Sequence, residues 1–170
     1  MPSRYPIMAI LVTALIAFLV ILAFRAWRAR ANAHETTFTA PAEWLEHPSG
    51  GRQWTNIQYV ATSVLGEPLN RVSAYGLGPR GFGKITISLD GLLLERNGER
   101  PLGIPTSQLL EVTRATATID RGVETDGLIQ IDWQQDGYGL STFIRATKNE
   151  DRTQIFENLT QLVTKETPNE

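Results

Sequence analysis

The sequence predicts a mainly β domain with one C-terminal α-helix, preceded by one N-terminal transmembrane helix. Three observations lead to this fold class. Residues 7–24 are an uncharged apolar run of 18 residues. Most of residues 52–147 alternate between apolar and polar side chains, which is the period of strands. Residues 150–165 then change to the 3.6-residue period of a helix. The expected units are a transmembrane anchor with a basic flank (1–30), a tether (31–51), one domain (52–165) and a tail (166–170).

The first element is a membrane span from Ile7 to Phe24. A helix of this length covers roughly 27 Å, close to the thickness of a hydrocarbon core. Aromatic and basic residues flank the run on both sides, where rings favour the headgroup layer and arginines reach water. The expected interface residues are Arg4, Tyr5, Arg25, Trp27, Arg28 and Arg30.

A cleaved signal peptide is the alternative reading of this segment, with Ala31-Asn32-Ala33 as the small-residue site. Signal sequences have apolar regions of about 7–15 residues, and their cleavage regions are usually neutral. Here the run is longer and three arginines precede the site. We therefore expect a retained single-pass anchor.

Orientation follows from the positive charges beside the span. Arg25, Arg28 and Arg30 on the C-terminal side outweigh Arg4 and the amino terminus, which favours a cytoplasmic domain at the plasma (inner) membrane. The absence of cysteine suits a reducing compartment and equally a disulfide-free exterior domain, so it does not decide the side.

Residues 31–51 predict a tether because small, polar and proline residues follow one another without a sustained period. One short helical turn is expected around Pro41 to Leu45. Trp44 lies in this tether, and it docks either on the domain or on the membrane surface.

Seven short strands are expected in the domain, and they predict an antiparallel barrel or sandwich. Asp90-Gly91 and Asp136-Gly137 are the dipeptides typical of two-residue hairpin turns. A short apolar segment at 102–104 accompanies the strands, which are expected at 53–64, 69–75, 84–89, 92–95, 109–118, 128–133 and 138–147.

The last element is a helix from Glu150 to Lys165 with Asn149 as its N-cap. Its apolar residues recur on one stripe, so this helix should pack against the sheet. The stripe consists of Ile155, Phe156, Leu159, Leu162 and Val163.

Several short sequences in this order resemble those of a known family. They are Tyr59-Val60-Ala61-Thr62-Ser63, Pro68-Leu69-Asn70-Arg71-Val72, Gly76-Leu77-Gly78, Gly91-Leu92-Leu93-Leu94, Ile104-Pro105 and Gly127-Leu128-Ile129-Gln130-Ile131-Asp132-Trp133. The chain resembles small actinobacterial membrane proteins with one N-terminal span and a bacterial PH-like domain, often labelled only as transporter, export or membrane proteins. The resemblance implies a PH-like fold and carries no catalytic or binding residue over to this chain.

No cofactor, metal site or catalytic residue is expected. Gly76 to Gly81 matches G-x-G-x-x-G, but an alternating strand follows it instead of a helix, which favours a flexible loop over a nucleotide site. The two histidines, His34 and His47, lie in the tether, where nothing holds them in catalytic geometry. Asp132 and Asp136 are best explained as polar residues at a strand end.

Charge argues against nucleic acid and phosphoinositides as partners. Outside the anchor, 12 basic residues face 18 acidic ones, and such a domain is repelled by anionic surfaces. PH domains of signalling proteins often bind inositol phosphates through basic residues between their first two strands. The corresponding loop here is Leu65 to Pro68, which has no Lys or Arg. Arg71, Arg80 and Lys84 form at most a weak local basic patch.

The expected function is therefore non-enzymatic. We expect an integral membrane protein whose domain binds an unknown protein or peptide at a sheet edge or at the open end of the barrel. Addition of a strand to the sheet edge is the favoured route, because it needs main-chain groups and pockets instead of charged motifs. The alternative is an accessory subunit of a transport or export complex, in which the span packs on other helices through Ala9, Thr13, Ala14 and Ala17.

Overall fold

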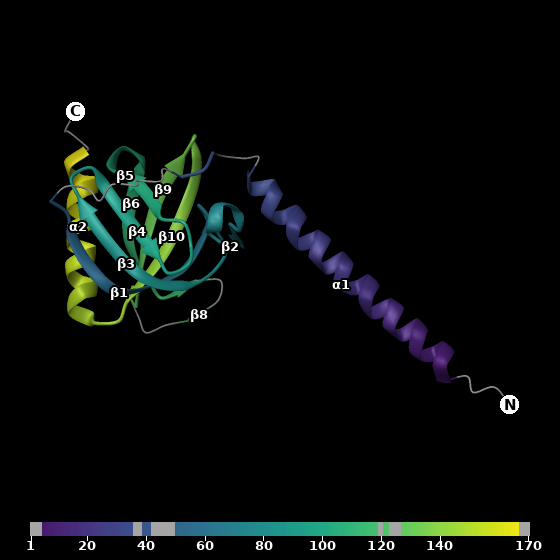
Figure 1. Ribbon diagram of the computed structural model, residues 1–170. Coiled ribbons are helices and arrows are strands. Elements are labelled where there is room, and N and C mark those ends of the chain that lie inside the picture. The colour runs from purple at the N-terminus through teal and green to yellow at the C-terminus, as the bar shows by residue number, and fades with distance from the viewer. Residues whose placement is uncertain (1–4, 36–38, 42–49, 119–120, 123–126, 167–170) are drawn as a thin grey trace.

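A long helix leads into the β domain and stands away from it. α1 (Tyr5–Glu35) projects from one side of the domain, and α2 (Asn149–Glu166) packs on the opposite side (Figure 1). The computed structural model of the 170-residue chain describes residues 5–35, 39–41, 50–118, 121–122 and 127–166. Within α1, the apolar stretch Met8–Ala26 has no residue buried against the domain. The chain thus has one N-terminal apolar helix long enough to cross a bilayer.

Eight antiparallel strands form the main sheet. Seven of them follow one path, β5-β4-β3-β1-β10-β9-β6, and β2 pairs with β1 off this path. Their bounds are β1 (Arg52–Val64), β2 (Glu67–Arg71), β3 (Gly81–Ser88), β4 (Gly91–Arg96), β5 (Leu102–Pro105), β6 (Leu109–Ala115), β9 (Leu128–Gln135) and β10 (Tyr138–Ala146). Two short strands, β7 (Ala117–Thr118) and β8 (Arg121–Gly122), pair separately.

The predicted fold class is confirmed. The domain is mainly antiparallel β with one C-terminal helix. Six of the seven expected strands lie on the sheet path, and the seventh strand of the path, β5, falls on the segment 102–104 that was expected only as a short apolar stretch. Among the described strands the two ends of the path, β5 and β6, are not paired with each other, so the sheet is curved but not closed. The 3₁₀ turn η2 (Thr106–Gln108) joins these two edge strands.

The Asp136-Gly137 turn forms as the sequence predicts. Both residues have positive φ, 52° and 78°, which is the requirement of the tight I′ hairpin that joins β9 to β10. In this turn Asp136 is exposed at the surface of the domain.

The core lies on the inner face of the sheet under α2. Trp54 and Trp133 are buried there, and Trp54 Nε1 donates to Gln154 Oε1 of the helix at 3.4 Å. The predicted stripe of α2 is confirmed, with Ile155, Leu159 and Leu162 buried and the other two residues partly buried. The helix begins at Asn149, which is therefore its first residue instead of its N-cap.

The connection between β1 and β3 differs from the prediction. Residues 69–75 were expected as a strand, but β2 ends at Arg71 and is followed by the 3₁₀ turn η1 (Ala74–Gly76). β2 pairs with only the last two residues of β1, Ser63 and Val64. The link between the neighbouring strands β1 and β3 is thus residues 65–80, not Leu65 to Pro68 alone, and it contains Arg71 and Arg80.

The expected strand 109–118 is also divided. β6 stops at Ala115, and β7 pairs with β8 instead of continuing the pairing with β9. A continuous run of strand-forming residues does not show where a chain leaves one sheet for another, because strand preference says nothing of the partner.

Candidate functional site

The most distinctive site lies at the open end of the domain, by which we mean the strand ends farthest from α2. Three connections meet there: residues 65–80, the turn after β4, and the Asp136-Gly137 turn. The C-terminal end of α1 contacts η1, so the anchor reaches the domain at this same end (Figure 1).

Part of the tether fills this end. The described tether segment, Thr39 to Pro41, is bound at its first residue by the turn between β9 and β10. Both the backbone N–H and the hydroxyl of Thr39 donate to Asp136 Oδ2, at 2.7 and 2.6 Å. Gln135 Nε2 donates to Thr39 Oγ1 at 3.0 Å. One tether residue thus makes three hydrogen bonds with one turn.

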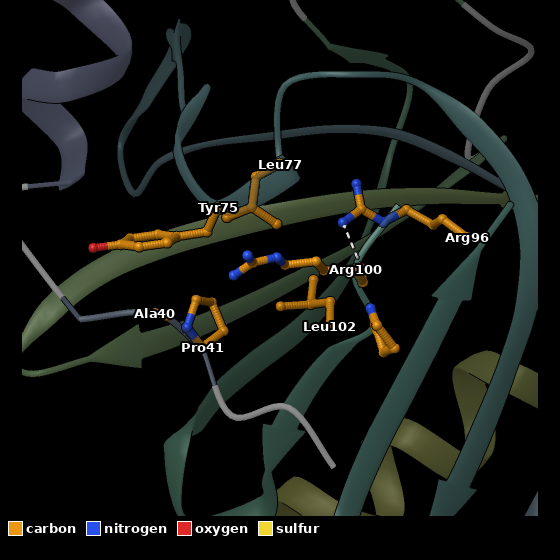
Figure 2. Close-up of a pocket in the computed structure, with 8 residues that line it drawn as sticks. Ala40, Pro41, Tyr75, Leu77, Arg96, Arg100 and Leu102 are labelled. Carbon is orange, nitrogen blue, oxygen red and sulfur yellow. Dashed lines mark hydrogen bonds between the residues drawn. The ribbon is translucent and has the colours of Figure 1, made fainter. Parts of the chain in front are cut away.

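Pro41 is buried in a groove of the domain (Figure 2). The groove is lined by Tyr75, Leu77, Arg96, Arg100, Pro101 and Leu102, together with Ala40 and Pro41 of the tether segment. With the tether segment in place, a void of only about 10 Å³ remains, which is about the space of one water molecule. The groove is therefore already filled by the chain itself.

Ionised Asp136 suits this contact. The two hydrogen bonds from Thr39, first from its hydroxyl and second from its N–H, hold the pKa of the Asp136 carboxyl below its usual range. Charge-assisted hydrogen bonds to a carboxylate are the stronger kind. Oε1 of the neighbouring Gln135 is buried and has no hydrogen-bond partner among the described residues.

Arg96 holds the floor of the groove. Its guanidinium lies 4.5 Å from the centroid of the Tyr59 ring and donates from Nη1 to Gly76 O at 2.6 Å. Its Nη2 donates to Arg100 O at 3.1 Å (Figure 2). Burial lowers the pKa of Arg96 from its usual value. Arg96 thus fixes η1 and the turn after β4 relative to each other, which makes it a structural residue of the groove.

A chain of buried hydroxyls runs behind this floor. Trp133 Nε1 donates to Thr142 Oγ1, which lies 2.9 Å from Thr62 Oγ1. Tyr59 Oη lies 2.9 Å from Thr62 Oγ1 and 2.7 Å from Leu77 O. An indole N–H can only donate and a carbonyl can only accept, so the three hydroxyls must point in one direction, from Trp133 to Leu77. Burial raises the pKa of Tyr59 to about 12.

The residues of the expected basic patch do not come together. Lys84 lies opposite Thr55 and Arg71 lies opposite Ser63, eight residues apart on β1, which is roughly 26 Å along an extended strand. Lys84 also forms an ion pair with Glu95 at 3.0 Å. Arg80 is exposed just before β3, so of the three it is Arg71 and Arg80 that share the connection at the open end.

The expected membrane residues fall on one helix as far as they are described. Tyr5, Ile7, Arg25, Trp27, Arg28 and Arg30 all lie in α1, and Arg4 lies outside the described residues. The apolar stretch Met8–Ala26 extends the predicted span, Ile7 to Phe24, by two residues at its C-terminal side. Helix α1 continues without a break through Ala31-Asn32-Ala33.

The catalytic candidates remain separate. Asp132 is buried and accepts from Gln130 Nε2, whereas exposed Asp136 binds the tether segment. The G-x-G-x-x-G sequence leads into strand β3, as the loop interpretation requires. His34 is at the end of α1, and His47 and Trp44 lie outside the described residues. Among the described residues no group of three or more His, Cys, Asp or Glu side chains is placed to hold a metal.

Comparison with known proteins identifies the fold of this domain. The family model described as "Bacterial PH domain-like" matches residues 46–160. No curated protein sequence matches significantly. One chain of the solved structure "The 8S snRNP Assembly Intermediate" resembles this chain with a TM-score of 0.51 and 12% identity, over 74% of this chain and 91% of that chain. At this identity the likeness shows the fold alone.

Proposed function

Because the chain belongs to the bacterial PH domain-like family, we propose that it is a membrane-anchored, non-enzymatic interaction module that binds an extended peptide segment of a protein partner. The groove at the open end is the proposed binding site. The open end was one of two surfaces expected from the sequence, the other being a sheet edge.

The observation that carries this proposal is that the domain already holds such a segment. Thr39 is bound through both its backbone and its side chain, and Pro41 is buried two residues later. Extended peptides are commonly recognised in this way, by a few polar contacts beside an apolar pocket. A surface that accommodates a cis segment has the shape and chemistry to accommodate one in trans.

Helix α1 serves as a retained anchor in this proposal. Its apolar stretch is exposed on all described sides, as a span in lipid should be. The arginines that follow it favour a cytoplasmic domain at the plasma membrane. A reporter that is active only in the cytoplasm, fused after Glu170, tests this orientation: it should be active, and a silent but stably expressed fusion contradicts the inward orientation.

Neither nucleic acid nor phosphoinositide is the proposed ligand. Arg71 and Arg80 lie in the connection that was expected to lack basic residues, but acidic side chains still outnumber basic ones outside the anchor. A net negative domain is repelled by both kinds of polyanion. Anchoring by α1 supplies the membrane attachment instead, and it raises the effective concentration of a weak binder at the membrane.

An anchor exchange tests whether the domain is the working part. Residues 34–170 attached to an unrelated single span should recover the same crosslinked partner as the full chain from native membranes. The matched control is the exchanged protein with Asp136 and the groove residue Arg100 both replaced by Ala, which should lose that partner. Recovery of the partner only with the native span would contradict the proposal.

The second candidate is an accessory subunit of a transport or export complex that acts through α1. The observation in its favour is that the span is exposed, with Thr13 Oγ1 satisfied by Ala9 O at 2.9 Å, which leaves a face of small residues for helix packing. The same anchor exchange decides between the two, because this candidate predicts that assembly is lost when an unrelated span replaces the native one.

A further inference from the structure

We infer that the groove selects a segment with a hydroxyl side chain two residues before a proline, and that Thr39 to Pro41 is its competing cis ligand. This inference rests on the proposed function, because it names the ligand class and the regulation of the same groove. In the described structure the groove is occupied, so a partner must displace the tether segment before it binds.

The first position requires a hydroxyl. The Thr39 oxygen donates to Asp136 Oδ2 and accepts from Gln135 Nε2 at once. Among the side chains only a hydroxyl both donates and accepts through one small atom, which restricts the position to Ser or Thr. A carboxylate there would be repelled by Asp136, and an alanine would lose the hydroxyl's bonds to both Asp136 and Gln135, keeping only the backbone bond to Asp136.

The third position suits proline for a different reason. Pro41 is buried beside Leu102 and Tyr75, and the void that remains holds about one water molecule. A buried residue at this position must not carry an unpaired backbone N–H, and proline has none. The filled groove leaves no room for a second ligand beside the cis segment.

Next to the contact between Thr39 and Asp136 lies a buried polar atom that the tether segment does not use. Oε1 of Gln135 is buried without a partner among the described residues, while Nε2 of the same amide binds Thr39. A buried acceptor of this kind is costly unless a donor reaches it. A ligand that supplies one more N–H than the tether segment can therefore bind more tightly than the cis ligand and displace it.

Displacement would also change the reach of the domain. With Thr39 bound, three residues separate it from Glu35 at the end of α1, which allows at most roughly 14 Å. When the segment is released, the link runs from Glu35 to Arg52 at the start of β1 and extends up to roughly 55 Å. Partner binding thus converts a domain held close to its anchor into one connected to it by a long linker.

Competitive binding in the full chain tests this inference. The probe is a fluorescently labelled peptide with the sequence of residues 34–43, added to the full chain in detergent micelles. The released variant carries Thr39→Ala and Pro41→Ala together, and Thr160→Ala on the exposed face of α2 is the matched control. The buried Trp54 and Trp133 report by their emission that each variant stays folded.

The peptide should bind the released variant at least tenfold more tightly than the wild type, because a cis ligand acts at an effective concentration in the millimolar range. The Thr39→Ser variant and the Thr160→Ala control should match the wild type. Adding Asp136→Ala to the released variant should abolish binding. Replacing by Ala the threonine of the peptide that corresponds to Thr39 should abolish it as well.

Equal affinity for the wild type and the released variant would overturn the competition. No binding to either, while the anchor-exchanged domain still recovers its partner, would overturn the ligand assignment and leave the proposed function standing. A wild-type dimer that grows with concentration and is lost in the released variant would show exchange of tethers between copies, which overturns the cis arrangement.

Discussion

At the scale of single residues, a few polar side chains at the open end do most of the positioning. Asp136 has the positive φ that its hairpin turn requires, and its carboxylate binds Thr39 of the tether, 97 positions away in the sequence. Tyr59 and Arg96, which lie 20 and 57 positions after Thr39 in the sequence, build the floor beneath it. Side chains of this kind were not identified from the sequence, because a contact across 97 residues leaves no local pattern.

Replacement of Tyr59 by Phe should destabilise the domain. It should also remove the loss of stability that ionisation of Tyr59 causes above pH 10. The lost hydroxyl leaves Leu77 O without its donor and Thr62 with Thr142 as its remaining partner, at a cost of about 1–3 kcal/mol. Because burial raises the pKa of Tyr59 from 10.0 to about 12, its contribution to the free energy of unfolding is intact below pH 10 and is lost as the pH rises from 10 toward 12.

Urea unfolding at pH 8 and pH 11 measures this effect. The stability difference between the wild type and Tyr59→Phe should be smaller at pH 11 than at pH 8. A difference that does not change with pH would mean that the Tyr59 hydroxyl does not titrate in this range.

Asp136 should control the protection of the tether. With Asp136→Ala, the amide N–H of Thr39 loses its acceptor and should exchange with solvent much faster than in the wild type, as hydrogen exchange measures. In the wild type the same loss should occur at low pH. The pKa of Asp136 is depressed, so the contact is present above its ordinary value of 3.8 and disappears as the pH falls below that value.

Thr147→Ala is the control for this measurement, because Thr147 bonds to Asn56 at the other end of the domain. If Thr39 exchanges at the same rate in the wild type and in Asp136→Ala, the carboxylate does not hold the tether.

At the scale of elements, the sequence predicted what depends on local period and turn chemistry. The hairpin at Asp136-Gly137 and the stripe of α2 form where they were expected, because each is set by neighbouring residues. The prediction of a strand at 69–75 was wrong because β2 ends at Arg71 and pairs with only two residues of β1. The apolar residues Val72 and Ala74 that follow it are buried without forming a strand. The tether segment was missed for a related reason: its fixed position comes from the domain, and its own residues show no period.

Truncation of the α2 stripe should cost much of the domain's stability. Leu159 is fully buried between the helix and the sheet, so Leu159→Ala should lower the free energy of unfolding by about 2–5 kcal/mol. Thr160→Ala on the exposed face of the same helix is the control and should change it by less than about 0.5 kcal/mol. Equal effects of the two variants in chemical denaturation would contradict the docking of α2.

No other residue should be tolerated in place of Gly83, where β3 pairs with β4. A Cβ added there would lie 1.9 Å from the backbone oxygen of Glu95, a contact that no side-chain movement relieves. Gly83→Ala should therefore cost more than the about 1–3 kcal/mol typical of overpacking or prevent folding. At Gly81 the nearest atom to an added Cβ is Arg96 Cβ at 4.0 Å, so Gly81→Ala should be tolerated. Thermal unfolding of the two variants measures the difference.

At the scale of the whole molecule, one apolar helix and one PH-like domain meet at the open end. The sequence predicted both parts, the helix from its uncharged apolar run and the domain from its alternating strands, but it could not predict where they meet. The C-terminal end of α1 contacts η1, and the tether segment fills the groove beside it. This places the proposed binding surface next to the anchor and away from α2 (Figure 1).

Site-specific photocrosslinking in native membranes tests most directly that this groove is the working surface. A photoreactive residue is placed at position 100 in the groove, at position 13 in the span, or at position 160 on the far helix. The account predicts a discrete adduct with a second protein from position 100 and none from position 160. An adduct from position 13 with none from position 100 would contradict it, because the span would then be the part that binds.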